Sequence, residues 1–489
     1  MNRLTKIFLR NPGQWQFWVI LALFVKGLIF LLQIAQAQNG GLAGFLGSFG
    51  GDTKTYIDPI DNLLRSGSYE PDQRMPGYGI IYFFLRLGLT KVIALNVLLF
   101  LQYIAASLSV YLLALSARKI FQSTAIFYTV FYLFLISTYS NLEDATLLTE
   151  SLTNSFLIFA VYFLLNWRET YRTIYLIIAG ILTTEVIFLR PIFLPLLLLF
   201  ALFILLTARK SGKRYFLKYA LVFLVPFILI DGAWIVRNFA VNKRFIPLMA
   251  TLYGENEDGV KPKVEWAAID FLKCWGGNYV WWDPRSEMRY FNIRETPANS
   301  HGKLMQDKFK PIPSDIYTSV FNADSLAALR DVIATIDFDS SLANCRDCAY
   351  VVAKFKKYGL SIKKEKPFLY YIIAPARMFS NFFVHSGTYN LFSKPANELN
   401  KLEFLTKIAY SLFYVFSLIL GFTGLVLLIP RSLLFGPESL VTGIVAYTTV
   451  IHPLILRLCE ARYFMPAWPF LLVLVAYTLI WVRNKFVKS

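Results

Sequence analysis

The chain has 489 residues, of which 56% are hydrophobic and 16% are charged. A soluble protein carries about a quarter charged residues, so this composition excludes an ordinary water-soluble enzyme. The formal net charge is +18, but much of the positive charge lies in short segments between apolar runs, where it indicates membrane orientation and not nucleic-acid binding. The sequence therefore predicts an all-α polytopic membrane protein.

Apolar runs long enough to cross the hydrocarbon layer recur along the whole chain. We read the first run as an uncleaved helix, because no small-residue cleavage pattern follows a short apolar region. The predicted membrane helices, about ten in number, span residues 16–36, 92–116, 122–139, 150–167, 172–189, 191–207, 215–236, 404–429, 433–451 and 463–482.

Basic residues predict the orientation of these helices. Arg118-Lys119, the connectors 168–172 and 209–214, and the tail 483–488 all fall on the side of the N-terminus, which the positive-inside rule makes the cytoplasm. The apolar run 77–89 is short for a span, and counting it as one would put Arg118 outside. We therefore expect it to lie in the outer interface.

Three segments are then outside, and function should lie in them: residues 37–91, 140–149 and about 238–400. The chain is thus predicted to have three domains. An N-terminal membrane domain, 1–237, contains the first outer loop, 37–91. It is followed by an extracytoplasmic domain with an interfacial helix, 238–400, and by C-terminal membrane helices, 401–489. In the middle domain, apolar residues at helical spacing predict a helix over 325–336, and the aromatic-rich segment 368–383 predicts a helix at the membrane surface.

Asp52 is the main catalytic candidate. It follows two glycines a short way beyond the first span, where a carboxylate could meet a lipid-linked substrate at headgroup depth and act as general base. Asp is also a common helix cap, so a capping role for a helix that starts at Thr53 is the alternative. Spacing alone favours the cap.

Several motifs follow one another in chain order. They are Gly51-Asp52-x-x-x-Tyr56 with Gly67-x-Tyr69 and Arg74-x-Pro-Gly-Tyr78; Glu143-Asp144 with Thr149-Glu150-Ser151-Leu152; Leu189-Arg190-Pro191; Trp234-x-x-Arg237-Asn238 with Phe245-Ile246-Pro247 and Gly254; and Glu460-Ala461-Arg462-Tyr463 with Pro466. Together they resemble the GT-C membrane glycosyltransferases. More closely, they are similar to the bacterial branch related to dolichyl-phosphate-mannose protein mannosyltransferases and to lipid A aminoarabinose transferases. Gly79 replaces a proline that is usual in those branches, and residues 260–370 match no pattern.

The resemblance implies a glycosyltransferase that passes a sugar from a polyprenyl-phosphate carrier to a lipid, glycan or protein acceptor. Transfer would invert the anomeric carbon, with Asp52 as general base and Tyr56 and Tyr78 in the substrate loop. It also implies that the active site of this multi-pass protein faces the outside. No Asn-x-Ser/Thr occurs in the chain, which favours a bacterial inner (plasma) membrane, and the placement of the basic residues predicts no nucleic-acid partner.

Four arginines lie at or beyond the outer ends of apolar runs, and guanidinium binds phosphate through paired hydrogen bonds. They are therefore candidates for binding the donor phosphate. Alternatively, an arginine at a helix end can extend its charged group to the membrane–water interface without binding a ligand. The four are Arg74, Arg190, Arg237 and Arg462.

A second acidic group consists of Glu143, Asp144 and Glu150. With Asp52 it could hold a divalent cation through oxygen ligands. A carrier with one phosphate has less charge to neutralise than a diphosphate, so we expect no obligatory metal or other cofactor.

Cys345 and Cys348 have the spacing of a redox pair, but a zinc site would need two further ligands nearby. In an oxidising outer compartment we expect a disulfide between them, or between one of them and Cys274.

Two other functions compete with the transferase: a lipid or oligosaccharide transporter (flippase), and a polymerase or ligase of surface polysaccharide. Transporters usually place charged residues at mid-membrane. Glu185 and Asp231 are expected toward the outer ends of their spans, which favours surface chemistry.

Overall fold

A computed structural model describes residues 10–37, 41–71, 74–209, 213–243, 245–249, 260–280, 283, 285–291, 312–336, 345–388, 391–392, 396–433 and 436–486. Across these ranges the regular secondary structure is helical, apart from one isolated bridge between Ser48 and Thr146. The predicted all-α polytopic architecture is confirmed. Gly254 of the fourth motif lies outside the described residues.

The chain folds into two compact units, each described here by itself. The first comprises Met1–Ala250, Ser386–Tyr447 and Phe464–Ser489, and the second comprises Thr251–His385 and Thr448–Tyr463. The boundaries of these units differ from those of the domains predicted from the sequence, because residues Thr448–Tyr463 pack with residues Thr251–His385.

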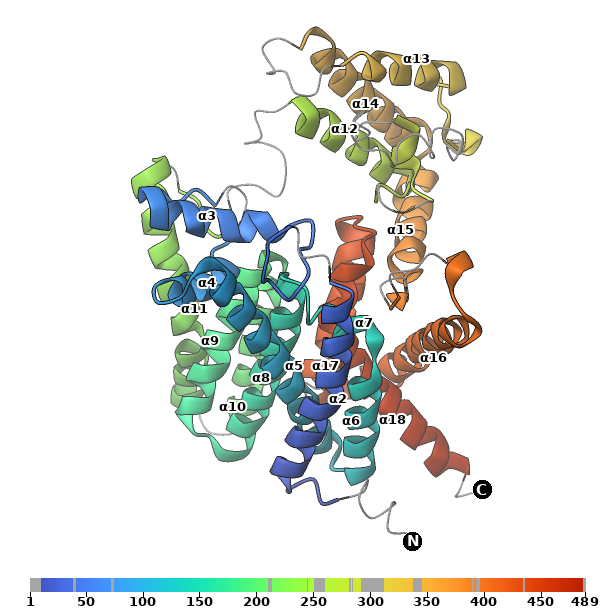
Figure 1. Ribbon diagram of the computed structural model, residues 1–489. Helices are drawn as coiled ribbons and strands as arrows, with labels where there is room; N and C mark the ends of the chain where they lie inside the picture. Colours follow the sequence, from blue (N-terminus) through green and yellow to red (C-terminus); the bar gives the residue numbers. More distant parts are fainter. Residues whose placement is uncertain are drawn as a thin grey trace. The chain divides into compact units, whose positions relative to one another are not determined.

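A helix is present at each of the predicted spans (Figure 1). Seven are long and apolar enough to cross a membrane, α6 and α9 are shorter apolar helices, and α8 carries more polar residues. These helices are α2 (Trp15–Ala35), α5 (Lys91–Phe121), α6 (Thr124–Ile136), α8 (Thr149–Thr170), α9 (Thr173–Leu189), η1 (Pro191–Phe193) with α10 (Leu194–Ala208), α11 (Lys213–Asn242), α16 (Lys401–Ser432), α17 (Glu438–Val450) with the π turn η9 (Ile451–Ile455), and η10 (Ala461–Ala467) with α18 (Trp468–Phe486).

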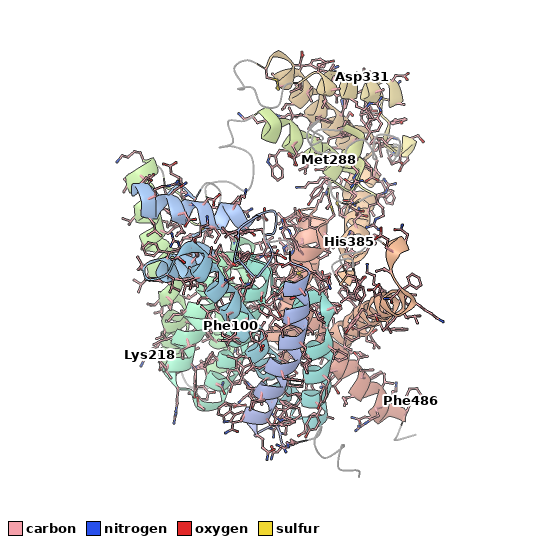
Figure 2. All side chains as sticks on the ribbon, in the orientation of Figure 1. Phe100, Lys218, Met288, Asp331, His385 and Phe486 are labelled. Atoms are coloured by element: carbon pink, nitrogen blue, oxygen red, sulfur yellow. A yellow bond between two sulfur atoms is a disulfide. The ribbon has the colours of Figure 1, made fainter. Side chains whose placement is uncertain are left out.

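The central helices of the first unit pack side by side: α5 against α8, α8 against α9, and α9 against α11. Large aromatic side chains fill the interior, as where Trp18 of α2 meets Phe127 and Phe131 of α6 edge to face. Apolar side chains such as Phe100 of α5 are exposed (Figure 2). Because the surrounding solvent is hydrocarbon, such exposure is expected of a membrane-spanning bundle.

Three short helices lie between the spans: α3 (Thr53–Ser66), α4 (Gly77–Arg86) and α7 (Thr138–Asn141). The ten residues of α4 extend about 15 Å, half of what a span requires, so the run 77–89 does not form a membrane-spanning helix. Asp61 of α3 pairs with Arg86 and Lys91, which fastens α3 to the helices that follow it.

The second unit is built from α12 (Val260–Trp275), η3 (Glu287–Phe291), η4 (Ser314–Ile316), α13 (Ala323–Ala334), α14 (Arg346–Glu365), the π turn η6 (Leu369–Ile373) and α15 (Ala374–Phe383), together with η9. Its core is a group of aromatic rings around Phe271. The helix predicted over 325–336 is confirmed as α13, where Asn322 caps the amide of Ser325.

The predicted helix over 368–383 is confirmed as η6 and α15, which continue without a break. Cys345 and Cys348 form a disulfide at the start of α14, while Cys274 and Cys459 are thiols.

Candidate active site

The two loops that carry the predicted acidic residues, 37–91 and 140–149, are joined by backbone hydrogen bonds. Ser48 donates to Ala145 O at 2.9 Å and accepts from Leu147 N at 3.0 Å. The hydroxyl of Thr53, the first residue of α3, donates to Leu147 O at 2.7 Å. These bonds fix the start of α3, and hence Asp52, against the loop that leads into α8.

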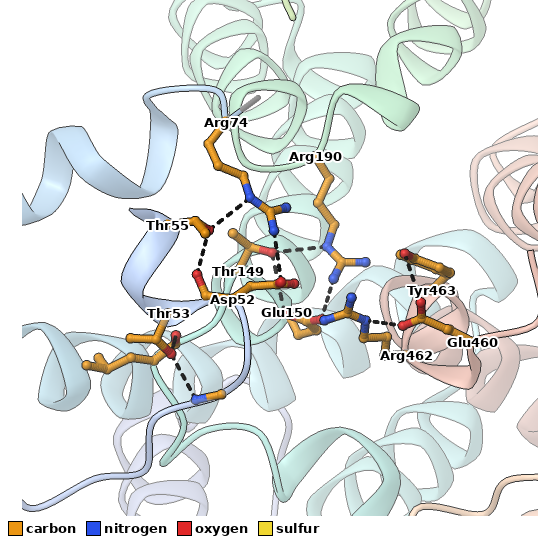
Figure 3. A network of polar contacts seen from close by, with 12 residues as sticks. Asp52, Thr53, Thr55, Arg74, Thr149, Glu150, Arg190, Glu460, Arg462 and Tyr463 are labelled. Carbon is orange, nitrogen blue, oxygen red and sulfur yellow. Dashed lines mark hydrogen bonds and ion pairs between the residues drawn. The ribbon is translucent and has the colours of Figure 1, made fainter. Parts of the chain in front are cut away.

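Asp52 occupies the position that precedes α3, but its side chain makes no capping hydrogen bond. Its Oδ1 instead lies 2.9 Å from Nη2 of Arg74 (Figure 3). Arg74 Nε also donates to the Thr55 hydroxyl at 3.0 Å. The side chains of Asp52 and Arg74 are 26% and 34% exposed, so both are accessible from solvent.

Tyr56 lies beneath this ion pair. The Arg74 guanidinium is 4.9 Å from the Tyr56 ring centre, and the rings of Tyr56 and Tyr78 are 5.4 Å apart. The Tyr78 hydroxyl donates to Gln102 Oε1 at 2.6 Å, and Gln102 Nε2 donates to Thr146 O at 3.0 Å. Both tyrosines predicted for the substrate loop are thus packed on the joined loops.

A second, more buried ion pair joins Arg190 to Glu150. Arg190 ends α9 and Glu150 lies in the first turn of α8, where the helix dipole favours a negative charge. Arg190 Nη2 contacts Glu150 Oε1, and Arg190 Nε donates to the Thr149 hydroxyl at 3.1 Å. The Glu150 side chain is 2% exposed and that of Arg190 is 11% exposed.

The charges of both ion pairs influence the pKa of Tyr56. Burial raises the pKa of its phenol, the charges of Glu150 and Asp52 add to this effect, and those of Arg74 and Arg190 oppose it. The phenol is therefore neutral near pH 7 and can donate a hydrogen bond. We call these five residues, Asp52, Tyr56, Arg74, Glu150 and Arg190, the Asp52 cluster.

Close backbone packing positions the two arginines of the cluster. A Cβ added to Gly77 would lie 2.6 Å from the carbonyl carbon of Phe188 and 2.9 Å from Leu189 N. Only glycine permits this approach of α4 to the end of α9. Arg74 lies three residues before Gly77, and Arg190 directly follows Leu189. The contact between the two backbones therefore holds both arginines in place.

The second acidic group does not gather into one site. Asp144 pairs with Lys26 of α2, with Nζ and Oδ2 2.8 Å apart, and accepts from the Ser151 hydroxyl at 2.6 Å. Glu150 faces Arg190, and Glu143 is half-buried in the turn directly before Asp144. Within the described ranges, no three Asp, Glu, His or Cys side chains are placed to hold a metal ion.

Arg237 has a different environment from Arg74 and Arg190. It lies inside α11, because that helix continues to Asn242 and does not end near residue 236 as predicted. Its guanidinium donates to Tyr69 O and, at 3.0 Å, to Asn238 Oδ1. It also lies 5.2 Å from the Trp234 ring centre. The Tyr69 contact ties the first outer loop to α11.

Arg462 belongs to the second unit. Its Nε contacts Glu460 Oε2 at 2.6 Å, and its guanidinium lies 5.5 Å from the ring centre of Tyr463 (Figure 3). The Arg462 side chain is about as exposed as that of Arg74.

The sequence interpretation missed Lys26, Thr149 and Gln102, which hold the acidic loop and the Arg190 pair in place. Lys26 carried a usable signal, since it is the one charged residue in the first predicted span and intramembrane charges generally have a partner. Thr149 appeared only as a member of the Thr149-Glu150-Ser151-Leu152 motif, and Gln102, a neutral polar residue inside the predicted span 92–116, carried no signal of its own.

The chain was compared with protein-family models, curated proteins and solved structures, and a similar protein was found among the solved structures. No protein-family model and no curated protein matches the chain. Among solved structures, it is similar to the Archaeoglobus fulgidus oligosaccharyltransferase in its apo form, at 16% sequence identity and a TM-score of 0.46. The match covers 96% of this chain and 51% of the other, so the chain spans about half the length of that protein.

Proposed function

We propose that the chain is a membrane glycosyltransferase that moves a sugar from a polyprenyl-phosphate carrier to an acceptor on the outer face of the membrane. The observation that carries this proposal is the ion pair between Asp52 and Arg74. It offers a base and a phosphate-binding cation side by side, both partly exposed, on a loop held by backbone hydrogen bonds. The sequence motifs that resemble the GT-C transferases include both residues.

The two members of the pair would separate when the donor binds. A phosphate oxygen competes with Asp52 for the Arg74 guanidinium, since both are anions that accept paired hydrogen bonds. Once Arg74 has turned to the phosphate, the carboxylate of Asp52 is available to the acceptor. The resting ion pair thus keeps each group neutralised until the substrate arrives.

The chemical step is a single displacement. The acceptor hydroxyl or amine attacks the anomeric carbon and gives its proton to Asp52, while the bond from that carbon to the phosphate oxygen breaks. The polyprenyl phosphate leaves with the electron pair, and nearby cations stabilise its growing charge. Attack opposite the leaving group inverts the anomeric configuration.

Arg190 is the second cation proposed for the leaving phosphate, with the neutral phenol of Tyr56 as a hydrogen-bond donor between the two arginines. Glu150 and Thr149 fix the Arg190 fork, so that little reorganisation is needed during the reaction. Arg237 and Arg462 remain proposed phosphate ligands, and both now have protein partners from which a phosphate would have to displace them. We propose no obligatory metal and a site that faces the outside of a bacterial inner membrane.

The test compares Asp52→Asn with Asp58→Asn, an exposed carboxylate within α3, the helix that Asp52 precedes. Surface glycans, lipids and proteins from cells with each variant are analysed by mass spectrometry, together with cells that lack the protein. We expect Asp52→Asn to match the deletion, because a base contributes roughly a hundredfold or more, and Asp58→Asn to match wild type.

A residue missing in the deletion and in Asp52→Asn would identify sugar and acceptor together. Full transfer by Asp52→Asn at wild-type expression would exclude Asp52 as the base. A deletion without any glycan change would contradict the transferase.

A further inference from the structure

The second unit holds a lysine against the segment 457–460. Lys273 lies in the last turn of α12, and its Nζ is 5.4 Å from the ring centre of Tyr279. The Tyr279 hydroxyl accepts from Cys459 N at 3.3 Å, and Arg457 Nη1 donates to Lys273 O at 2.9 Å. Two separate contacts within one compact unit therefore fix this segment beside the end of α12.

The charge of Lys273 is only partly compensated. Among the residues that the structure describes, its ammonium group forms no ion pair with a carboxylate. Burial lowers the pKa of this group, and the charges of Asp270 and Glu460 oppose that effect. Glu460 is thus close enough to act on the lysine charge, although it does not pair with it.

Glu460 is paired with Arg462 instead (Figure 3). Its Oε2 accepts from Arg462 Nε at 2.6 Å, and its Oε1 accepts from the Tyr463 hydroxyl at 3.5 Å. The Glu460 side chain is only 12% exposed. A phosphate that took the Arg462 guanidinium would leave this carboxylate without a cation, and a buried charge without a partner is strongly unfavourable.

We propose that Glu460 exchanges partners when a phosphate binds, leaving Arg462 and pairing with Lys273. Two ion pairs, one of Lys273 with Glu460 and one of Arg462 with the phosphate, then replace a single pair. Lys273 is a positioning residue in this exchange, since it releases Arg462 for the phosphate without contacting the phosphate itself. The inference rests on the proposed function, in which Arg462 binds the carrier phosphate.

Arg457 is the other cation of this segment, and its own contacts hold it in place. Besides its bond to Lys273 O, its Nη2 donates to Tyr370 O at 2.6 Å. Its guanidinium lies 4.1 Å from the Tyr370 ring centre. The ammonium of Lys273 has a flexible four-carbon stem and no such hydrogen bonds, so it is the cation that can receive Glu460.

The experiment uses the full chain in nanodiscs, with farnesyl phosphate as the probe and farnesol as the control for the lipid chain. The rate at which acetic anhydride modifies the Lys273 amine is followed by mass spectrometry. Farnesyl phosphate should slow this modification severalfold, because an ammonium in an ion pair seldom loses its proton, and farnesol should not. Lys356, an exposed residue of α14, is the internal control and should react at one rate throughout.

In Glu460→Gln the slowing at Lys273 should disappear. Lys273→Met should bind farnesyl phosphate on the order of tenfold more weakly, whereas Lys273→Arg and Lys356→Met should bind it like wild type. Thermal unfolding checks that these variants are folded, and the wild-type labelling result needs no variant.

The outcomes separate the exchange from the function on which it rests. If Arg462→Gln weakens binding but the probe leaves the reactivity of Lys273 unchanged, the exchange is wrong and the phosphate role of Arg462 stands. If the probe does not bind, or binds equally well to Arg462→Gln, both are wrong.

Discussion

Lys26 and Asp144 form an ion pair that is almost completely buried in the helix bundle, and it joins the first span to the acidic outer loop. The Lys26 Nζ also donates to Asn141 Oδ1 at 2.9 Å, so one cation holds two points of that loop. Removing one member leaves the other buried and unpaired. We expect Lys26→Met to cost about 3 to 5 kcal/mol, seen as a lower midpoint of thermal unfolding in detergent.

The double variant Lys26→Met/Asp144→Leu is the matched control. Replacing both charges by apolar groups is often neutral, so the double variant should recover most of the lost stability. If the single and double variants unfold alike, the pair does not provide the stabilisation assigned to it.

The close contact at Gly77 predicts a large effect from a single methyl group. In Gly77→Ala the added Cβ meets backbone atoms of Phe188 and Leu189, which cannot rotate away. We expect a loss of about 1 to 3 kcal/mol and reduced transfer, because α4 and the end of α9 move apart and displace Arg74 and Arg190.

Gly88→Ala provides the comparison, since nothing lies within 4 Å of an added Cβ at that position. Its unfolding midpoint should equal or slightly exceed that of wild type. Equal behaviour of the two alanine variants would show that the backbones do not approach as described.

Arginine-to-lysine substitutions separate phosphate binding from anchoring. At a site that grips the leaving phosphate, lysine keeps the charge but loses the planar fork, which should cost about 2 to 4 kcal/mol of transition-state stabilisation, or roughly thirty to a thousandfold in rate. From the Asp52 cluster we expect this penalty for Arg74→Lys and Arg190→Lys, measured as initial rate with purified protein.

Arg237→Lys should lower thermal stability as well, since it loses the contact with Tyr69, and Arg462→Lys is measured in parallel. Wild-type rates for all four lysine variants would remove this account of leaving-group stabilisation and would favour the transporter alternative.

Orientation can be measured with single cysteines in a background without Cys274 and Cys459. The exposed positions Ser68 and Ser314 should react with a membrane-impermeant thiol reagent added outside intact cells, and the exposed position Thr170 should not. Lysed cells supply the control, in which all three should react. Labelling of position 170 alone in intact cells would invert the orientation.

The helical spans could be predicted from sequence because hydrophobicity alone determines which segments enter a membrane. Their ends were less predictable: α11 and α5 continue beyond the predicted limits, since a helix ends where its backbone hydrogen bonds end and not where the hydrocarbon does. The same reasoning explains why Arg237 was expected at the exit of a span and is found within a helix.

The partners of the site residues were beyond sequence reasoning. Local spacing favoured Asp52 as a helix cap, whereas Arg74, contributed by the later part of the same outer loop, takes the carboxylate. Asp144 and Glu150 looked like one acidic group because they are close in sequence. They lie in different sites because each pairs with a cation that is distant in sequence: Asp144 with Lys26, and Glu150 with Arg190.

The 13 residues of α6 rise only about 20 Å, while the hydrocarbon layer is about 30 Å thick. The chain leaves this helix at Ser137, whose hydroxyl accepts from the Trp468 indole at 2.7 Å, so the early turn is sealed by protein. For the proposed transferase, bilayer thickness would then be a kinetic variable. We expect faster turnover in short-chain lipids, whose phosphates lie closer to the ends of so short a helix, and slower turnover in long-chain lipids, without any change in the protein.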